Sequence, residues 1–452
     1  MTVLHARHAL TETGWQRDVT VTLAEGRIAS VAPGHHGAGQ AVGLLLPAPV
    51  NLHSHCFQRA MAGLTERRDG SGRDSFWTWR DLMYRFLAHL TPEDVGAIAA
   101  QAMVEMAEAG YGAVAEFHYL HHQAEGQAYA DLAELSGRIV QASAETGLGL
   151  TLLPVLYQQG GCDGRALGAG QLRFGNDHDR FAGLLQAAEA HLATLPADAV
   201  LGLAPHSLRA VTPEALALAA QMRPGAPLHL HLAEQQAEVD EVLAHRGARP
   251  VEWLLQNADV DPRWCLIHST QMVPDETTAL ARTGAVAGLC PITEANLGDG
   301  IFDGLRWQAA SGRFGVGTDS NVQISLTGEL RLYEYSQRLR DRGRAMLATA
   351  DQSTGRVLWQ SAVQGGAQAA GRAAGGIAPG RWADLVAYDD HALALDGLAG
   401  DALLDALIFA SDLRCDALWS AGRQIVAHGR HIARDRIETR FRATMAGLRG
   451  RM

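Results

Sequence analysis

Apolar runs recur along most of the chain and are separated by segments whose apolar residues follow helical spacing. Amphipathic segments such as Glu93–Ala109 and Arg180–Leu195 lie between most of these runs. The runs are Leu44–His53, Ala113–Tyr119, Gly149–Leu156, Val200–Pro205, Pro227–Ala233, Trp264–His268, Ala285–Cys290 and Phe314–Thr318. Strands that alternate with helices indicate parallel βα units, and eight such units favour a closed (β/α)8 TIM barrel of the α/β class. A doubly wound sheet is the alternative, although no Gly-x-Gly-x-x-Gly follows the first run.

The two ends of the chain carry a different pattern, in which short β-rich runs are separated by glycine turns. These runs are Asp18–Leu23, Arg27–Val31 and Ala41–Leu46 near the start, and Asp384–Tyr388, Cys415–Ser420 and Arg423–Val426 near the end. Such runs predict strands. We therefore expect one small β domain built from both ends. Residues 1–47 would form its N-terminal part, 48–372 the (β/α)8 barrel, and 373–452 its C-terminal part with a terminal helix.

Metal-binding side chains stand at the ends of four of the predicted barrel strands. They are His53 and His55 after the first, His231 and Glu234 after the fifth, His268 after the sixth and Asp319 after the eighth. The carboxyl ends of barrel strands form the active site, and alternate residues of a strand face one side. Imidazole and carboxylate ligands suit a zinc-type ion, so the sequence predicts a metal site. His229 shares a face with His231 one layer deeper, and we expect it either to pack or to support the metal ligands from behind.

The composition excludes several other kinds of chemistry. All 38 basic residues are arginine, and the absence of lysine rules out Schiff-base catalysis, P-loop phosphate binding and a carbamylated-lysine metal bridge. A net charge of −11 argues against a broad nucleic-acid or anionic-membrane surface. No apolar run is long enough to cross a bilayer. The scattered cysteines and the lack of a signal-peptide pattern lead us to expect a cytoplasmic protein.

Together these residues resemble the amidohydrolase superfamily. The run Gly376–Val386 also resembles that family's return into its β domain. The resemblance implies one zinc ion per chain, bound by His53, His55, His231 and Asp319. It implies that Asp319 and His268 orient the attacking water and accept its proton, while Glu234 passes a proton to the leaving nitrogen. Because no lysine can bridge a second metal, we expect a mononuclear site.

Longer runs look like the formimidoylglutamate deiminases of histidine degradation, a branch of that superfamily. The matching runs are Asn51–Gly63, Asp74–Tyr84, Glu116–His122, Ala204–Arg209 and His231–Gln235. Enzymes of that branch hydrolyse N-formimino-L-glutamate to N-formyl-L-glutamate and ammonia. The resemblance implies that the substrate is contacted by Gln58, Arg80, Tyr119, His206 and Arg209. Cys56 stands where this branch leads us to expect alanine, and its role is left open.

Arginine gives the resemblance a physical basis. The substrate carries two carboxylates, and the guanidinium fork binds a carboxylate through two charge-assisted hydrogen bonds. Arg80 and Arg209 are suitable donors. The alternative function is another deaminase of the same branch, acting on a purine, pyrimidine or triazine ring, whose pocket would favour aromatic and amide contacts. A second alternative is a non-catalytic scaffold protein. The complete set of metal ligands and the presence of Glu234 argue against it.

The expected partners follow from these interpretations. We expect a small-molecule dicarboxylate substrate, no nucleic-acid or membrane partner, and a homodimer. The sequence leaves the choice among zinc, iron and manganese open.

Overall fold

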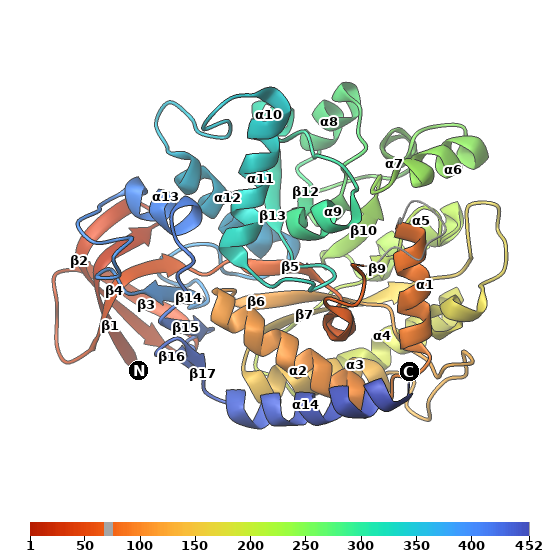
Figure 1. Ribbon diagram of the computed structural model, residues 1–452, viewed down its shortest axis with the longest axis horizontal. Coiled ribbons are helices and arrows are strands. Elements are labelled where there is room, and N and C mark those ends of the chain that lie inside the picture. The colour runs from red at the N-terminus through yellow and green to blue at the C-terminus, as the bar shows by residue number, and fades with distance from the viewer. Residues whose placement is uncertain (67–75, 452) are drawn as a thin grey trace.

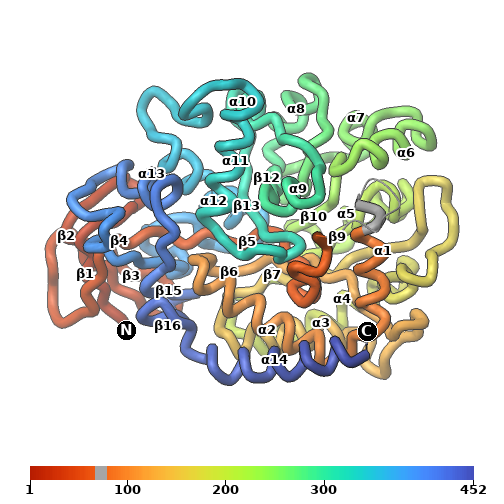
Figure 2. Tube along the Cα trace, in the orientation of Figure 1, coloured from red at the N-terminus to blue at the C-terminus, as the bar shows by residue number. Residues whose placement is uncertain are grey.

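The computed structural model describes residues 1–66 and 76–451, and within it both ends of the chain contribute strands to one sheet. This end sheet has the strand order β17-β16-β15-β14-β4-β1-β2-β3. Its strands are β1 (Thr2–Thr11), β2 (Gly14–Ala24), β3 (Arg27–Pro33), β4 (Gln40–Pro47), β14 (Leu385–Tyr388), β15 (Ala417–Ser420), β16 (Arg423–Ala427) and β17 (Arg430–His431). Strand β4 joins the two halves, parallel to β1 and antiparallel to β14. Red and blue segments therefore lie side by side at this end of the molecule (Figure 1 and Figure 2).

Two further sheets are parallel throughout and lie beside the end sheet (Figure 1). One has the order β5-β6-β7-β8, with β9 also paired to β7, and the other has the order β10-β11-β12-β13. Their strands are β5 (Val50–Ser54), β6 (Ala113–His118), β7 (Gly149–Leu156), β8 (Val200–Leu201), β9 (Ala204–Pro205), β10 (Leu228–Leu232), β11 (Trp264–His268), β12 (Val286–Leu289) and β13 (Arg313–Val316). Parallel bridges join the two sheets at both seams, Ser54 to Asp319 and Leu203 to Leu228. The predicted α/β class with parallel sheets is confirmed.

Helices follow most of the parallel strands and cover their outer faces (Figure 1). They are α1 (Phe76–Leu87), α2 (Pro92–Ala109), α3 (Glu134–Thr146), α4 (His178–Leu192), α5 (Pro213–Met222), α6 (Gln236–Arg246), α7 (Pro250–Asn257), α8 (Pro274–Ala281), α9 (Pro291–Leu297), α10 (Gly304–Ala309), α11 (Leu326–Asp341), α12 (Thr354–Ala369), α13 (Asp401–Phe409) and α14 (Arg434–Arg451), with short 3-10 helices η1 (Cys56–Met61) and η2 (Ala169–Phe174). No helix in the described part of the chain has the length and apolar character to cross a membrane.

Local sequence explains where the long helix α2 begins and ends. Thr91 and Asp94 form a reciprocal capping box around Pro92, and Gly110 ends the helix with a φ of 102°. The first turn is stabilised because these side chains satisfy backbone N–H groups that lack intrahelical partners. The predicted terminal helix is present as α14, and it packs along α2.

Two strand predictions were wrong in detail. The run Leu44–His53 was expected to be one strand, but it is divided at Ala48-Pro49 into β4 of the end sheet and β5 of a parallel sheet. Proline has no N–H to donate to a ladder, so the chain changes sheets there. The run Val200–Pro205 is likewise divided into β8 and β9. At that break the N–H of Leu203 donates to the carbonyl of Pro227 and not to β7.

Strand β1 had no counterpart among the predicted elements. It lies inside the end sheet between β4 and β2, and it is buried on both faces over much of its length. His5 and His8 are among its buried residues, and His5 Nδ1 lies 3.1 Å from Thr20 Oγ1. The strand was not predicted because these histidines interrupt its apolar pattern. A central strand can bury a histidine when its ring has a hydrogen-bond partner.

The space between the two parallel sheets is filled with packed side chains. Leu52 of β5, Cys265 and Ile267 of β11, and Val286 of β12 form one buried cluster there. Interdigitating residues from different strands make this a core and not a channel. The cluster forms the floor on which the polar side chains at the carboxyl ends of the strands stand.

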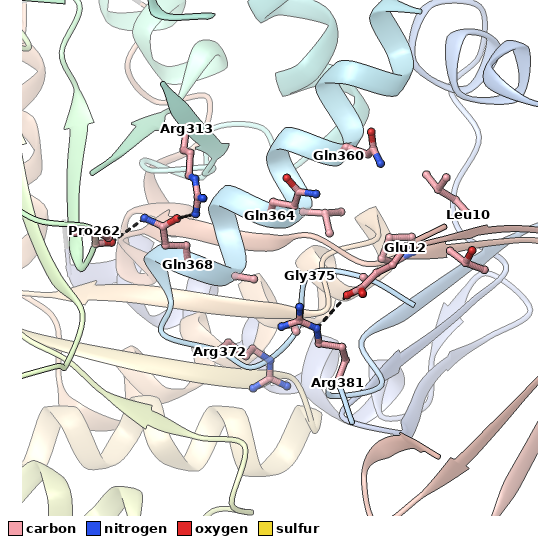
Figure 3. Close-up of a pocket in the computed structure, with 16 residues that line it drawn as sticks. Leu10, Glu12, Pro262, Arg313, Gln360, Gln364, Gln368, Arg372, Gly375 and Arg381 are labelled. Carbon is pink, nitrogen blue, oxygen red and sulfur yellow. Dashed lines mark hydrogen bonds and ion pairs between the residues drawn. The ribbon is translucent and has the colours of Figure 1, made fainter. Parts of the chain in front are cut away.

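A polar cleft lies at the opposite, amino ends of the parallel strands, where they meet the end sheet (Figure 3). Arg313 at the start of β13 donates to Gln368 of α12, whose amide donates in turn to the carbonyl of Pro262. Arg381 and Glu12 form an ion pair of 3.1 Å across the cleft. These contacts connect the end sheet, α12 and the parallel strands.

Candidate active site

One cavity at the carboxyl ends of the parallel strands contains most of the predicted site residues. It is lined by side chains that follow β5, β6, β7, β9, β10 and β11, together with Asp319 after β13. All five predicted substrate contacts line it: Gln58, Arg80, Tyr119, His206 and Arg209. The matching run Asp74–Tyr84 begins outside the described residues, since Asp74 and Ser75 are not among them.

The predicted metal ligands converge on one point beside this cavity. His53, His231, His268 and Asp319 each place one ligand atom within 4.8 Å of the others. His53 Nε2 lies 3.3 Å from Asp319 Oδ1, and His55 Nε2 lies 3.2 Å from the same oxygen. The structure therefore brings together all four residues that the resemblance names as ligands, with His268 beside them.

Backbone carbonyls fix which ring nitrogens face that point. Nδ1 of His55 donates to the carbonyl of Phe117 at 3.0 Å, and Nδ1 of His231 donates to the carbonyl of His206 at 3.1 Å. Burial lowers the pKa of His231 well below its ordinary value, so the ring is neutral and its Nε2 is an unprotonated acceptor. Orientation of a metal-binding histidine by a carbonyl on its other nitrogen is common.

The donor set fits a zinc-type ion. Nε2 of His231 lies 3.1 Å from Nε2 of His53, and burial also lowers the pKa of His53 to about 3. Nε2 of His231 is an acceptor and lies with the Asp319 carboxylate around Nε2 of His53, so acceptors outnumber donors at this point. A cation between them removes this mismatch, and imidazole with carboxylate is the ligand chemistry that zinc takes.

His268 and Glu234 stand side by side next to the metal point. His268 Nε2 lies 3.8 Å from Glu234 Oε1 and 3.9 Å from Asp319 Oδ2. Burial opposes the charged form of His268, but the carboxylates of Glu234, Glu294 and Asp319 outweigh it and raise its pKa to about 10. Burial raises the pKa of Glu234, which favours its protonated form. Because the raised pKa values favour the protonated forms of both side chains, His268 and Glu234 can exchange protons with a bound substrate.

Glu238 holds the backbone on which Glu234 sits. Its carboxylate accepts from the N–H of Ala233 at 3.2 Å and from the N–H of Glu234 at 3.0 Å. Ala233 has a φ of 51°, a left-handed conformation that costs energy for a residue with a Cβ. The two hydrogen bonds stabilise this turn and so fix the direction of the Glu234 side chain. No pattern in the sequence indicates this role, although Glu238 lies four residues after Glu234.

Glu294 was also missed by the sequence analysis. The Nδ1–H of His268 donates to Glu294 Oε1 at 3.3 Å, and the N–H of Cys290 donates to the same oxygen at 2.8 Å. His268, Cys290 and Glu294 together have metal-ligand spacing. Burial, however, raises the pKa of the Cys290 thiol well above its ordinary value, so it stays protonated. We read Glu294 as the group that orients His268.

Cys56 and His229 point away from the metal. The Cys56 thiol donates to Glu116 Oε2 at 2.8 Å, and burial raises the pKa of this thiol well above its ordinary value. Glu116 Oε1 also accepts from the N–H of Cys56 at 2.7 Å, so this pair holds the chain just after His55. Nε2 of His229 donates to the carbonyl of Ala369 at 2.8 Å in the floor below the site, in keeping with a packing role.

The substrate side of the cavity combines aromatic walls with two arginines. Gln58 Nε2 donates to the hydroxyl of Tyr119 at 2.8 Å. The ring of His206 lies 4.9 Å from that of His231, and burial, with Arg209 nearby, lowers the pKa of His206 well below its ordinary value. A neutral imidazole therefore lines the cavity next to the predicted metal ligand His231 and together with the two arginines.

Comparisons with known proteins agree with this geometry. The amidohydrolase family model matches residues 44–424, and the model of the N-terminal domain of formimidoylglutamate deiminase HutF matches residues 1–41. The crystal structure of an amidohydrolase from Brucella melitensis is 47% identical with a TM-score of 0.96, covering 99% of this chain and 100% of that one. An adenosine deaminase from Xanthomonas campestris with bound zinc has a TM-score of 0.81 over 99% of this chain and 98% of its own, and its 21% identity shows likeness of fold alone.

The chain therefore belongs to the amidohydrolase family and is a hydrolase that acts on a C–N bond. Within this family, formimidoylglutamate deiminase from Pseudomonas aeruginosa is 49% identical to it over 447 residues, which is 98% of this chain and 98% of that protein. The likeness includes both the end sheet and the parallel strands.

Proposed function

We propose that this protein is a zinc-dependent enzyme that hydrolyses N-formimino-L-glutamate to N-formyl-L-glutamate and ammonia. One zinc ion per chain would be held by His53, His55, His231 and Asp319 at the mouth of a closed (β/α)8 barrel. The observation that carries the proposal is the placement of Arg80 and Arg209 in the same cavity as the metal-ligand cluster. Two guanidinium groups suit the two carboxylates of this substrate.

Different residues of the cavity have different roles in the reaction. When bound, zinc lowers the pKa of water toward neutrality and so supplies a nucleophile. Asp319 and His268, whose Oδ2 and Nε2 lie 3.9 Å apart, would orient that nucleophile, and Asp319 would take its proton, because the raised pKa of His268 leaves its Nε2 already protonated. Glu234 gives a proton to the nitrogen that leaves as ammonia, because burial favours its protonated form. Neutral His206 donates a hydrogen bond to the polar head of the substrate.

The arrangement separates the two halves of the substrate. Its formimino head lies against Glu234 and His268, and its carboxylates extend toward Arg80 and Arg209. Gln58 and Tyr119, which are hydrogen-bonded to one another, would contact the part between them. Binding energy from the carboxylates is then available to orient the reacting carbon.

A comparison of substrates tests this function. Purified protein loaded with zinc should release ammonia from N-formimino-L-glutamate with a kcat/KM at least about 1000-fold higher than from guanine, cytosine or adenosine, because a pocket that pairs buried charges discriminates strongly against ligands that lack them. Preferred turnover of a ring substrate would contradict the proposal and support the alternative of a ring deaminase. A protein without stoichiometric metal and without turnover would instead indicate a scaffold.

Several narrower predictions accompany this function. The domain boundaries after residues 47 and 372, a homodimer and a cytoplasmic location stay predictions. Metal analysis of the purified protein decides among zinc, iron and manganese, and the proposal expects one zinc per chain.

A further inference from the structure

Tyr157 occupies a position in the cavity that the sequence analysis did not single out. It directly follows β7, is only 8% exposed, and lines the cavity together with Arg80 and Arg209. Its ring packs edge-on against that of His206 with 4.6 Å between the centroids. This contact fixes the position of the ring, so the hydroxyl group of Tyr157 has a defined place beside the substrate-binding groups.

A hydrogen-bond chain determines which way the Tyr157 hydroxyl points. The N–H of Gly168 donates to Gln171 Oε1 at 2.9 Å, so the other end of this amide is the NH2 group. That group, Gln171 Nε2, donates to the Tyr157 hydroxyl oxygen at 2.8 Å. Since an amide NH2 cannot accept, the hydroxyl hydrogen of Tyr157 is directed elsewhere. The oxygen acts as an acceptor toward Gln171 and keeps its hydrogen for another partner.

Burial keeps Tyr157 a neutral donor. Burial raises the pKa of Tyr157, although Arg209 and Arg80 both favour the ionised form. The phenol is therefore protonated at neutral pH. Tyr119 differs in this respect, because its hydroxyl hydrogen has a partner in Met83 Sδ at 3.5 Å. Among the described residues, no protein group accepts the hydroxyl hydrogen of Tyr157, in contrast to that of Tyr119.

We propose that Tyr157 donates its hydroxyl hydrogen to the same substrate carboxylate that Arg209 binds. This inference rests on the function proposed above and adds a residue that selects for an anionic, planar acceptor. A carboxylate has about four lone-pair directions, so it can accept from a guanidinium fork and from a phenol at the same time. Because Gln171 fixes the Tyr157 hydroxyl as a donor, the site distinguishes a carboxylate from a neutral amide. The NH2 end of an amide is itself a donor and could not accept from the hydroxyl.

The first test removes only the hydroxyl group. Tyr157→Phe should raise the KM for N-formimino-L-glutamate about 10- to 100-fold, the range for a hydrogen bond to a charged group, while kcat changes by less than about threefold. Zinc content and the thermal midpoint should stay as in the wild type. Tyr333→Phe is the matched control, because Tyr333 on α11 is also buried and does not line the cavity.

The second test reverses the hydrogen bond. In Gln171→Glu, a carboxylate would accept from Tyr157 and turn its hydrogen away from the cavity. Gln171→Glu should raise KM by a larger factor in the wild-type background than in the Tyr157→Phe background. In this double-mutant cycle, the ratio of the two factors measures how much the direction of the hydroxyl contributes. Equal factors in the two backgrounds would overturn the inference, because a simple charge effect acts on both.

The outcome separates this inference from the proposed function. Wild-type protein that releases ammonia from N-formimino-L-glutamate, with an unchanged KM in Tyr157→Phe, would leave the function standing and overturn the role of Tyr157. Wild-type protein without this activity would overturn the function. Calorimetric titration with glutarate would then still decide on Tyr157, since the inference expects about 10- to 100-fold weaker binding of this dicarboxylate to Tyr157→Phe.

Discussion

The two ends of the parallel strands both bury charged and polar side chains, but they balance them differently. At the amino ends, Arg372 donates to Asp384 at 2.6 Å and to Asp198 at 2.8 Å, and Arg423 also binds Asp198 at 2.8 Å. At the carboxyl ends, Nε2 of His53 lies 3.1 Å from Nε2 of His231 and 3.3 Å from the Asp319 carboxylate. The first set pairs each charge with its opposite, whereas the second collects acceptors around one point.

Backbone strain is found at the carboxyl ends, although not only there, since Ser311 just before β13 has a φ of 60°. Left-handed φ angles occur in residues other than glycine at Ala233 (51°), His268 (70°), Ser269 (53°) and Asp319 (45°), all at the carboxyl ends of strands. Such conformations cost about 1–3 kcal/mol each and persist where the surrounding structure enforces them. The amino ends therefore stabilise the fold, while the carboxyl ends hold the geometry to which the proposed metal and substrate would bind.

The largest expected effect follows from removing a metal ligand. Asp319→Ala should lower kcat/KM about 10 000-fold, because the metal supplies several kcal/mol of transition-state stabilisation and each tenfold step is about 1.4 kcal/mol. Metal analysis should find less than one zinc per chain, while circular dichroism and the urea midpoint show a folded protein. Two tightly bound metals in the wild type would show that a bridging ligand other than lysine exists.

The next effect concerns stability at the other end. Arg372→Met should lower the free energy of unfolding by about 3–5 kcal/mol, since it leaves the carboxylates of Asp198 and Asp384 buried with one partner fewer. Urea unfolding measures this loss, and the fraction that stays folded should keep its zinc and its kcat/KM. Arg381→Met is the control, because its ion pair with Glu12 is about half exposed (47% and 44%) and should contribute less than about 1 kcal/mol.

The sequence predicted the carboxyl ends of the strands better than the amino ends. His53, His55, His231, His268 and Asp319 could be found because their residue types are rare at strand ends and share one chemistry. The network of Arg372 could not, since its partners come from distant segments and an arginine beside an aspartate is common in any sequence. Glu238 and Glu294 were also missed. They act through other residues, and no motif in the sequence marks their positions.

A smaller effect is expected from the proton-transfer group. Glu234→Gln should keep one zinc per chain and lower kcat by at least about 100-fold, the lower end for a positioned acid or base. The shape of the side chain is preserved, so the hydrogen bonds that Glu238 accepts from the backbone should remain and the urea midpoint should not move. Turnover close to that of the wild type in a zinc-loaded Glu234→Gln enzyme would remove this residue from the mechanism.

The last prediction sets Arg209 against Arg372, one arginine from each end of the strands. Arg209→Met should raise the KM for N-formimino-L-glutamate about 10- to 150-fold, because a lost charge-assisted hydrogen bond is worth about 1.5–3 kcal/mol. Its effect on the free energy of unfolding should be smaller than that of Arg372→Met, because Arg372 pairs with two buried carboxylates of the protein, whereas the partner proposed for Arg209 is a carboxylate of the substrate. The increase in KM should shrink for a formimino compound that lacks the corresponding carboxylate, since the partner is then absent from both enzymes. If Arg209→Met affects both compounds equally and also destabilises the fold, Arg209 supports structure as Arg372 does, and the contrast between the two ends does not extend to their arginines.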